Sequence, residues 1–362
     1  MPPAGRPIPL RPLLMPALYD PSTDPSDMRA AVRAFPEHLA EGWARGAAFD
    51  DADLDPAVYD GVVLCGMGGS AIGGDLVRGI VEPTSPLPFV VNRGYTLPAW
   101  VGEGTLVIAS SYSGGTEETL AAFGDAIGRG ADVVVVTSGG EIVERAAAED
   151  LDVVTIPGGL QPRAALGYSL GVGLRLARAL GLAALPDDEV EAAFAAARER
   201  AVANDEDADG TLARDLAGDL SDAIPLIYTG VGLLEPVGMR WRTQIHENAK
   251  HPAYGNLLPE LNHNEIMGFE AAPEDLLRRM HVVALRDVDD HPQVAKRFDS
   301  TCELVSPLVG GWTTVESEGG SRLARALSLI QLGDAVSFWM SVHKGVDPTP
   351  VETIQALKKT LA

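Results

Sequence analysis

Two segments of the chain combine closely spaced glycines with hydroxyl side chains, each at a point where an apolar run gives way to a helical pattern. They are CGMGGSAIGGD (65–75) and SSYSGGTEET (110–119). Glycines let backbone N–H groups approach a ligand, and a helix N-terminus favours an anion. In the second segment Ser111, Ser113 and Thr116 add three hydroxyls, which suit the three oxygens of a phosphate monoester. Because ligands bind at the carboxyl ends of parallel strands, we expect the two segments to form one phosphate cup.

Each segment also has a plainer interpretation. The first contains a loose dinucleotide fingerprint, Gly66-x-Gly68-x-x-Ala71. The next apolar run, however, ends in Asn92 and Arg93 and not in the acidic residue that holds an adenosine ribose. An NADP site could tolerate that arginine, and the glycines could also serve tight packing alone. The second segment could be an ordinary helix cap with a capping-box glutamate, although three hydroxyls and two glycines exceed what a cap needs.

An arginine and a glutamate offer the groups that proton transfer beside a carbonyl requires. Arg163, in QPRAALGYS (161–169), stands at a predicted helix start, where the positive end of the helix gains nothing from a cation. It is either an ordinary surface residue or a group that stabilises negative charge on a substrate. Glu247 follows an apolar helix face. Together they could supply a carboxylate base and a cation for the developing oxyanion.

The segment 246–270 is a dense polar stretch that contains three histidines. Solvated polar surface would explain His246 and His251. His263 lies in the sequence NHNE within an apolar context, where an imidazole could donate a proton alongside a carboxylate base. The three histidines lack the i, i+4 pairing of a helical zinc motif, so we expect no metal site.

The composition excludes several classes of protein. The 362 residues include 28 basic and 51 acidic ones, for a net charge of −23, and only five are lysine. A polyanion of this size repels nucleic acid and anionic membranes. No apolar run is as long as the roughly 18 residues that a membrane span needs. Cys65 and Cys302 are too few for a disulfide framework, so we expect both to be buried and reduced in a cytoplasmic protein.

Apolar runs that alternate with helical patterns surround these segments. The predicted strands are 61–66, 88–92, 105–111, 131–138, 152–157, 224–230 and 280–287. The predicted helices are 26–48, 70–82, 115–129, 140–149, 164–181, 187–204, a helix ending near 250, 291–300, 319–343 and 349–361, and CELVSP (302–307) stands apart from the helix before it. Nearly continuous Val and Ile runs separated by helices indicate an α/β fold whose parallel sheets are covered on both faces.

The chain divides into two similar halves. VVLCGMGGSAIGGDLV (62–77) and PLIYTGVGLLEPVGMRW (225–241) each run from a strand through a glycine-containing turn into a helix, which is a weak internal repeat. We therefore predict an N-terminal arm, a first domain with a leading helix, a helix with an acidic hinge, and a second domain with a C-terminal helix. Their predicted bounds are 1–25, 26–186, 187–222 and 223–362.

Several of these motifs, taken together, resemble those of a known family. GMGGSAIGGD and SYSGGTEET are similar to the paired phosphate-binding turns of sugar isomerase (SIS) domains. PRAALGY, ENAK, PELNHNEI and KGVDPTPVETIQALKK resemble the bifunctional phosphoglucose/phosphomannose isomerases, and the resemblance covers about residues 30–362. It implies two SIS domains, each a parallel sheet flanked by helices. It also implies a homodimer with active sites at the subunit interface, and isomerisation of glucose 6-phosphate and mannose 6-phosphate to fructose 6-phosphate without metal or organic cofactor.

The same resemblance implies roles for individual residues. Glu247 is similar to the base that moves a proton between C2 and C1, and Arg163 to the group that stabilises a cis-enediolate. His263, donated by the neighbouring subunit, would help to open the sugar ring with a C-terminal lysine as its partner. The residues implied to hold the phosphate are Gly69, Ser70, Ser111, Ser113 and Thr116.

Two positions near the C-terminus stay open. Lys358 is our choice for the active-site lysine, and Lys359 and Lys344 compete with it. The resemblance also implies a threonine in this region that makes room for the mannose epimer, and Thr349 and Thr353 are both available. A sugar-phosphate sensor that lacks catalysis is the alternative function; it would need the phosphate cup but not the base. An NADP-dependent oxidoreductase is a third, which the serine-rich loops would obstruct.

Overall fold

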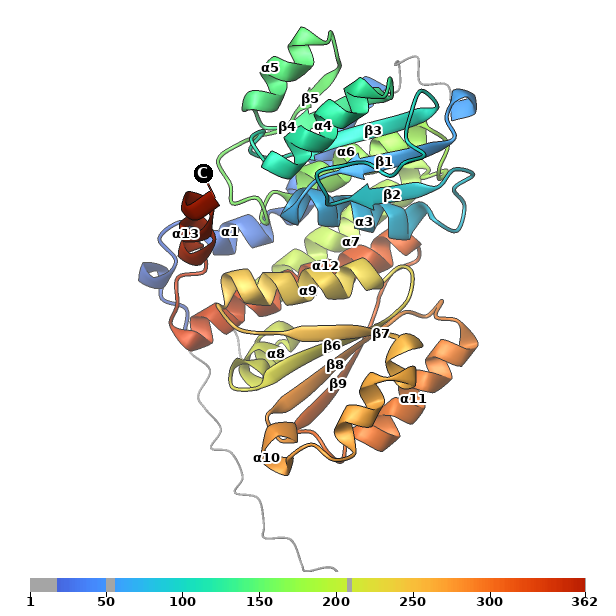
Figure 1. Cartoon of the computed structure of the whole chain (residues 1–362). Coiled ribbons are helices and arrows are strands. Elements are labelled where there is room, and N and C mark those ends of the chain that lie inside the picture. The colour runs from blue at the N-terminus through green and yellow to red at the C-terminus, as the bar shows by residue number, and fades with distance from the viewer. Residues whose placement is uncertain (1–17, 50–55, 207–209, 362) are drawn as a thin grey trace, which may run out of the picture.

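Two parallel β-sheets enclose a layer of helices (Figure 1). The computed structural model describes residues 18–49, 56–206 and 210–361. Most of the predicted N-terminal arm and part of the acidic hinge therefore lie outside the described residues. The first sheet has five strands in the order β2-β1-β3-β4-β5, and the second has four in the order β7-β6-β8-β9.

The first sheet confirms the predicted strands of the first half. All its neighbouring strands are parallel, and Cys65 of β1 lies between Asn92 of β2 and Ala109 of β3. Val and Ile fill the inner strands because both faces are covered. The strands are β1 (Gly61–Cys65), β2 (Phe89–Asn92), β3 (Thr105–Ser111), β4 (Asp132–Thr137) and β5 (Val153–Thr155).

The second sheet repeats this arrangement, because in both sheets the first strand pairs with the second on one side and the third on the other. Thus β6 corresponds to β1 and β8 to β3. Two of its strands, β7 and β9, are absent from the sequence prediction, and residues 302–305 continue the preceding helix. The strands are β6 (Ile224–Gly230), β7 (Tyr254–Leu258), β8 (Met280–Arg286) and β9 (Gly311–Glu316).

Helices connect and cover the strands in both halves. Those of the first half are α1 (Met28–Arg33), α2 (Phe35–Arg45), α3 (Gly68–Val81), α4 (Glu117–Gly128), α5 (Glu141–Ala148), α6 (Leu166–Ala179) and α7 (Asp187–Asp205). Those of the second half are α8 (Leu212–Ser221), α9 (Glu235–Asn248), α10 (Glu274–Leu277), α11 (Pro292–Val305), α12 (Arg322–Lys344) and α13 (Glu352–Leu361).

One hydrophobic core joins the two halves. It contains residues from α2, α3 and α6 of the first half and from α8, α9 and α12 of the second. The helix α12 is buried from Leu323 to Val342, as expected for a helix that crosses the centre of a molecule. Although α7 falls in the predicted linker, it packs against α12 and α2, so it belongs to the shared helical layer.

The structure bears on two predictions from composition, the lack of a membrane-spanning helix and the state of the two cysteines. No helix in the described part of the chain is long and apolar enough to cross a bilayer. Cys65 is buried, which raises the pKa of its thiol to about 12, and Cys302 is only partly buried. Both cysteines are free thiols, and the expectation that both are buried is wrong for Cys302.

Candidate active site

The two glycine-rich segments meet at the carboxyl edge of the first sheet. They follow β1 and β3, which are paired neighbours. A Cβ atom added at Gly66 would lie 2.9 Å from the carbonyl oxygen of Ser110, so the two turns are in direct contact. The helices α3 and α4 begin immediately after the turns. The predicted cup is therefore present as a geometric feature, with two helix N-termini at its base.

The hydroxyls of the second turn bond to one another and to the turn. The Ser111 hydroxyl donates to Oγ1 of Thr116 at 3.0 Å and accepts from the backbone N–H of Gly114 at 3.1 Å. Thr116 is the N-cap residue of α4, but its side chain makes no capping hydrogen bond, and neither does Met67 before α3. The interpretation of this segment as an ordinary capping box is therefore wrong. The first N–H groups of both helices remain available for an anion.

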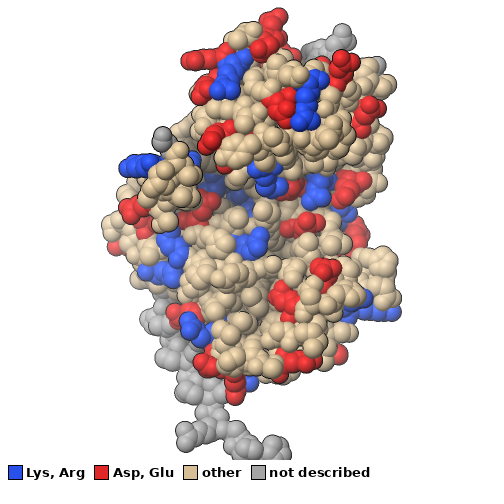
Figure 2. Space-filling view, viewed as in Figure 1, with Lys and Arg blue, Asp and Glu red and all other residues tan. Residues whose placement is uncertain are grey.

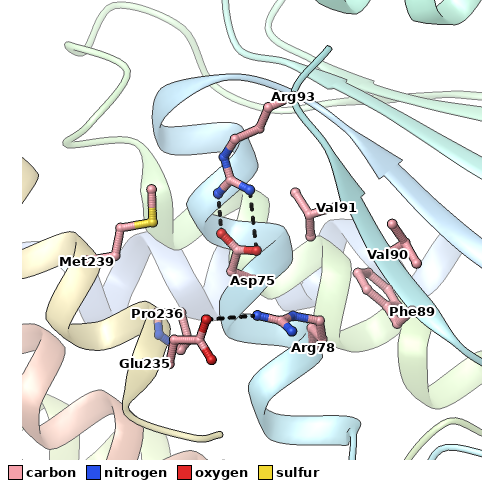
Figure 3. A pocket seen from close by; sticks show the side chains of 9 residues that line it. All are labelled: Asp75, Arg78, Phe89, Val90, Val91, Arg93, Glu235, Pro236 and Met239. Atoms are coloured by element: carbon pink, nitrogen blue, oxygen red, sulfur yellow. Dashed lines mark hydrogen bonds and ion pairs between the residues drawn. The ribbon is translucent and has the colours of Figure 1, made fainter. Parts of the chain in front are cut away.

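Arg93 is occupied by a carboxylate of its own chain. It follows β2, and its guanidinium donates two hydrogen bonds to Asp75 of α3 (Figure 3). The pair borders a cavity of about 360 Å³, on whose other side Arg78 of α3 lies 3.7 Å from Glu235 of α9. Because Asp75 neutralises Arg93, the cation that an NADP 2′-phosphate would need is already paired.

Arg163 is buried between the two halves. Its side chain is 4 % exposed, and it lies in the turn before α6. Nη1 donates to Oε2 of Glu247 at 3.2 Å, Nε donates to Oδ1 of Asn248 at 2.7 Å, and Nη2 donates to the carbonyl oxygens of Pro348 and Thr349 at 2.7 and 3.1 Å. Burial lowers the pKa of Arg163, and the neighbouring carboxylate opposes that change. Its interpretation as an ordinary surface residue is wrong.

Glu247 occupies the last turn of α9, where the helix dipole is negative and favours cations nearby. Arg163 is one such cation, and Lys250 is a second that the sequence analysis did not single out. The Lys250 ammonium donates to the carbonyl oxygens of Glu247 and Pro348 at 2.5 and 2.8 Å. Burial and the charge of Arg163 lower the pKa of Lys250. Two cations therefore contact Glu247: Arg163 contacts its carboxylate and Lys250 its backbone carbonyl oxygen. The only advance signal for the second was its place in ENAK.

The glycine-rich turn before α3 lies against the turn that carries Arg163. A Cβ atom added at Gly69 would lie 2.6 Å from the carbonyl oxygen of Pro162 and 3.6 Å from Cα of Arg163. The turn at the start of α3 therefore touches the turn that carries the arginine. Ser70 is buried in the first turn of α3, and Ser113 is exposed at the rim.

The C-terminal helix borders a cavity of about 570 Å³ that contains Glu247 and Lys250. Thr353 at the start of α13 lines this cavity, whereas Thr349 gives its carbonyl oxygen to Arg163. Figure 2 shows a hollow with basic side chains beside α13 on this face. Lys358 and Lys359 are both exposed on α13, and the ammonium of Lys344 lies 3.1 Å from Nδ1 of His251.

His263 lies away from the other predicted catalytic residues of its own chain. Glu247 precedes β7 and His263 follows it, so the two lie toward opposite ends of this strand (Figure 1). The five residues of β7 alone span about 16 Å. The imidazole is exposed, in a segment held by Glu265, which accepts from Tyr228 at 2.5 Å and from Asn256 at 2.6 Å. A single chain therefore does not bring His263 to Glu247.

In the described part of the chain, no three His, Cys, Asp or Glu side chains are grouped as a metal ion would require. The histidines of the polar segment have other contacts. His246 Nε2 lies 2.8 Å from the carbonyl oxygen of Ala253, and His251 Nε2 lies 2.6 Å from that of Ala223. These two side chains fix the backbone around the end of α9.

The fold and the site define a class of two-domain α/β proteins with two glycine-rich turns at the carboxyl edge of the first sheet. The fold is similar to the C-terminal domain of glucosamine-fructose-6-phosphate aminotransferase from Francisella tularensis, with a TM-score of 0.68, 16 % identity and coverage of 88 % of this chain and 96 % of that chain. It is also similar to glucosamine-6-phosphate deaminase from Thermotoga maritima, with a TM-score of 0.62, 14 % identity and coverage of 87 % and 96 %. These likenesses concern the fold alone.

Sequence comparison assigns the family. Residues 210–361 match the model of the bacterial phospho-glucose isomerase C-terminal SIS domain. The chain is 47 % identical to a bifunctional phosphoglucose/phosphomannose isomerase of Caldicellulosiruptor bescii, over 92 % of this chain and 99 % of that protein. It is 37 % identical to the protein of the same name from Aquifex aeolicus, over 89 % and 97 %. The chain belongs to the bifunctional phosphoglucose/phosphomannose isomerase family, and the predicted pair of SIS domains is confirmed.

Proposed function

We propose that the protein catalyses the reversible isomerisation of glucose 6-phosphate and mannose 6-phosphate to fructose 6-phosphate. Its relatives are bifunctional phosphoglucose/phosphomannose isomerases, which supports this activity. The observation that carries the proposal is the Arg163–Glu247 contact of 3.2 Å, because it sets a base and a cation beside the phosphate cup. A sensor of sugar phosphates would need the cup alone.

In the proposed reaction the substrate phosphate binds in the cup. The N–H groups at the starts of α3 and α4 donate to its oxygens, and the helix dipoles favour its negative charge. Hydroxyls complete the set of donors, so the phosphate needs no lysine in the cup. The proposed ligands are Gly69, Ser70, Ser111, Ser113 and Thr116.

Glu247 acts as the base. Its carboxylate removes the proton from C2 of the open-chain aldose and then delivers a proton to C1, while the proton of the C2 hydroxyl passes to O1. Between the two steps the proton on the Glu247 carboxyl can exchange with solvent. The intermediate is a cis-enediolate, and Arg163 stabilises its negative charge, as preorganised donors do for developing oxyanions. Both sugars give the same intermediate, because the C2 stereocentre is lost when the proton leaves. No redox cofactor enters this sequence, and a metal is not required to balance it.

Ring opening of the sugar uses two residues that do not contact Glu247 within one chain, a histidine and a lysine. We propose that His263 of the partner subunit completes each site of a homodimer, since it is exposed and lies beyond β7 from the base. Lys358 is the proposed lysine, because it follows Ile354 by one helical turn and Ile354 lines the cavity. Thr353, which also lines the cavity, is the proposed residue for tolerance of the mannose epimer.

The proposal is tested by following fructose 6-phosphate formation from each sugar phosphate, with EDTA present. Wild type should convert both sugars, and Glu247→Gln should lose about 10²–10⁴-fold in rate, as general-base losses do. Glu235→Gln is a matched control, because this residue lies at the other end of α9 with a similar exposure, 36 % against 32 %. Binding of glucose 6-phosphate without turnover would favour the sensor, and loss of activity with EDTA would contradict a metal-free reaction.

A further inference from the structure

Asn248, next to the proposed base, is bonded on both sides and has no exposed surface. Its Oδ1 accepts from Nε of Arg163 at 2.7 Å, and its Nδ2 donates to Oγ of Ser337 on α12 at 2.9 Å. The Ser337 hydroxyl in turn donates to the carbonyl oxygen of Asp334 at 2.7 Å. The Asn248 amide therefore has a fixed orientation, set by α12 and not by a substrate.

Arg240 holds the backbone of the same arginine. Its Nη2 donates to the carbonyl oxygen of Arg163 at 3.1 Å and to Oδ2 of Asp334 at 2.6 Å. Gln244 donates to the other oxygen of Asp334 at 3.1 Å. Burial raises the pKa of Asp334, and the Arg240 cation opposes this shift. Arg240, Gln244 and Asn248 are spaced by four residues along α9, so one face of the helix presents all three to α12.

Such a buried polar face is not the most stabilising way to pack two helices together. Well-packed apolar residues are often as stabilising as a buried ion pair, or more so. Asn248 and Arg240 of this face instead bond to Arg163 directly, and Gln244 bonds to Asp334, which holds Arg240. The arrangement is therefore better explained by the geometry that it imposes on Arg163 than by stability.

That geometry limits how Arg163 meets the base. A guanidinium beside a carboxylate tends to form two parallel hydrogen bonds, which would occupy both carboxylate oxygens. Here Asn248 takes Nε, and the carbonyls of Pro348 and Thr349 take Nη2. Nη1 contacts only Oε2 of Glu247, so Oε1 has no bond from Arg163 and stays free for proton transfer.

We propose that Asn248 and Arg240 are positioning residues for the isomerase reaction. They hold Arg163 so that it donates one hydrogen bond, and not two, to the Glu247 carboxylate. The inference rests on the proposed function. Neither residue touches the substrate: Asn248 acts on the side chain of Arg163 and Arg240 on its backbone. Their loss should affect turnover and not phosphate binding, because the phosphate is held by the turns of the first sheet.

The experiment measures kcat and KM for glucose 6-phosphate in four proteins: wild type, Asn248→Leu, Asn248→Asp and Ser341→Ala. Leucine has a similar size but accepts no hydrogen bond, so kcat should fall about 10–100-fold, as small misplacements of catalytic groups do, with KM within about threefold of wild type. Aspartate keeps the acceptor for Arg163, and the Ser337 hydroxyl can turn to donate to it. Asn248→Asp should therefore recover most of the lost kcat. Ser341 is equally buried on α12 but donates to the carbonyl oxygen of Phe338, so Ser341→Ala should behave as wild type.

Three results would overturn the inference while wild type remains active. They are a wild-type kcat in Asn248→Leu, equal losses in the leucine and aspartate variants, or a rise in KM that accounts for the whole loss. An inactive wild type would instead overturn the proposed function, and this inference with it. If Asn248→Leu fails to fold, Ser337→Ala takes its place: it frees the Asn248 amide, and its kcat should fall severalfold while KM is kept.

Discussion

The carboxyl edges of the two sheets differ in whether their backbone N–H groups are free to bind an anion. From the last residue of β3 the chain reads SYSGGTEE, with hydroxyls and glycines, and after the corresponding strand β8 it reads DVDDHPQ, with three aspartates. In the first turn, Thr116 does not cap α4 with its side chain. In the second, Nδ1 of His291 accepts from the N–H of Gln293 and caps α11. Only the first turn leaves a helix N-terminus open.

At the second edge, aspartate carboxylates of the chain itself accept the hydrogen bonds that a bound anion would accept. The N–H of Asp287 donates to Asp290 and the N–H of Asp289 donates to Asp287, both at 3.1 Å. A Cβ atom added at Gly230, the end of β6, would lie 2.8 Å from Oδ1 of Asp290, so this carboxylate fills the space at the strand end. Arg325 of α12 pairs with Asp287 at 2.8 Å and with Asp289.

The comparison teaches that the same topology gives a binding edge or a structural edge according to a few residues. Where hydroxyls and glycines leave N–H groups unpaired, an external phosphate can bind. Where carboxylates and a histidine accept from the N–H groups of the turn and an internal arginine balances the charge, the edge joins the sheet to α12 instead.

The largest expected effect comes from giving the first edge a carboxylate like those of the second. Ser111→Asp should raise KM for glucose 6-phosphate by about 100-fold or more, since facing like charges costs several kcal/mol. Thr314→Asp, on the exposed edge strand β9, is the control and should leave KM unchanged. Steady-state kinetics at fixed ionic strength would check this, and equal KM values in the two variants would contradict a phosphate site at Ser111.

Removing the internal cation of the second edge should affect stability. Arg325→Met leaves buried Asp287 without its charge partner, which should cost about 3–5 kcal/mol of unfolding free energy. Denaturant unfolding measures the loss. In the folded fraction KM should stay at the wild-type value, and a rise in KM would show that the second edge also binds substrate.

Removing one hydroxyl from the first edge should have a smaller effect. Ser111→Ala deletes a proposed donor to the phosphate and the acceptor for the Gly114 N–H, so KM should rise about 10-fold, as for a lost hydrogen bond to a charged group. Its kcat should change less than KM does. A change confined to kcat would place Ser111 in the chemical step and not in phosphate binding.

The smallest effect concerns Asp290. Burial and the nearby Asp287 raise the pKa of Asp290 to about 6 from an ordinary value of 3.8. A raised carboxyl pKa means that ionisation destabilises the folded state above pH 6, and that this cost disappears as pH falls from 6 toward 4. Asp290→Asn should therefore be more stable than wild type by up to about 1 kcal/mol at pH 7.5, after allowance for solvent screening. Near pH 4 the two should unfold alike, and a pH-independent difference would refute this explanation.

The sequence predicted the strands that lie inside the sheets better than those at the edges. Buried runs such as 105–111 and 224–230 match β3 and β6 residue for residue. The missed strands β7 and β9 lie at the edges of the second sheet, where half-exposed sequences such as YGNLL show no continuous apolar run. A one-residue break at Ala34 also divides the predicted leading helix into α1 and α2.

At the site, the two turns could be predicted because residue type and spacing carry their chemistry, and the roles of Arg163 and Glu247 followed from the family resemblance. The neighbours that tertiary packing brings could not. Lys250 reaches the carbonyl of Pro348 from a left-handed backbone conformation with φ 51°. Asn248 looks like an ordinary helix residue until α12 is placed beside it. The roles of His263 and Lys358 stay predictions, because neither meets Glu247 within one chain.

The central claim is that Glu247 moves a proton between C2 and C1 of a sugar phosphate held by the first sheet. It is tested most directly by incubating fructose 6-phosphate in deuterium oxide with EDTA and following deuterium at C2 of the aldose product by NMR. Wild type should incorporate deuterium, and Glu247→Gln should do so at least about 100-fold more slowly. Equal rates of turnover and of deuterium incorporation by the two proteins would contradict Glu247 as the base.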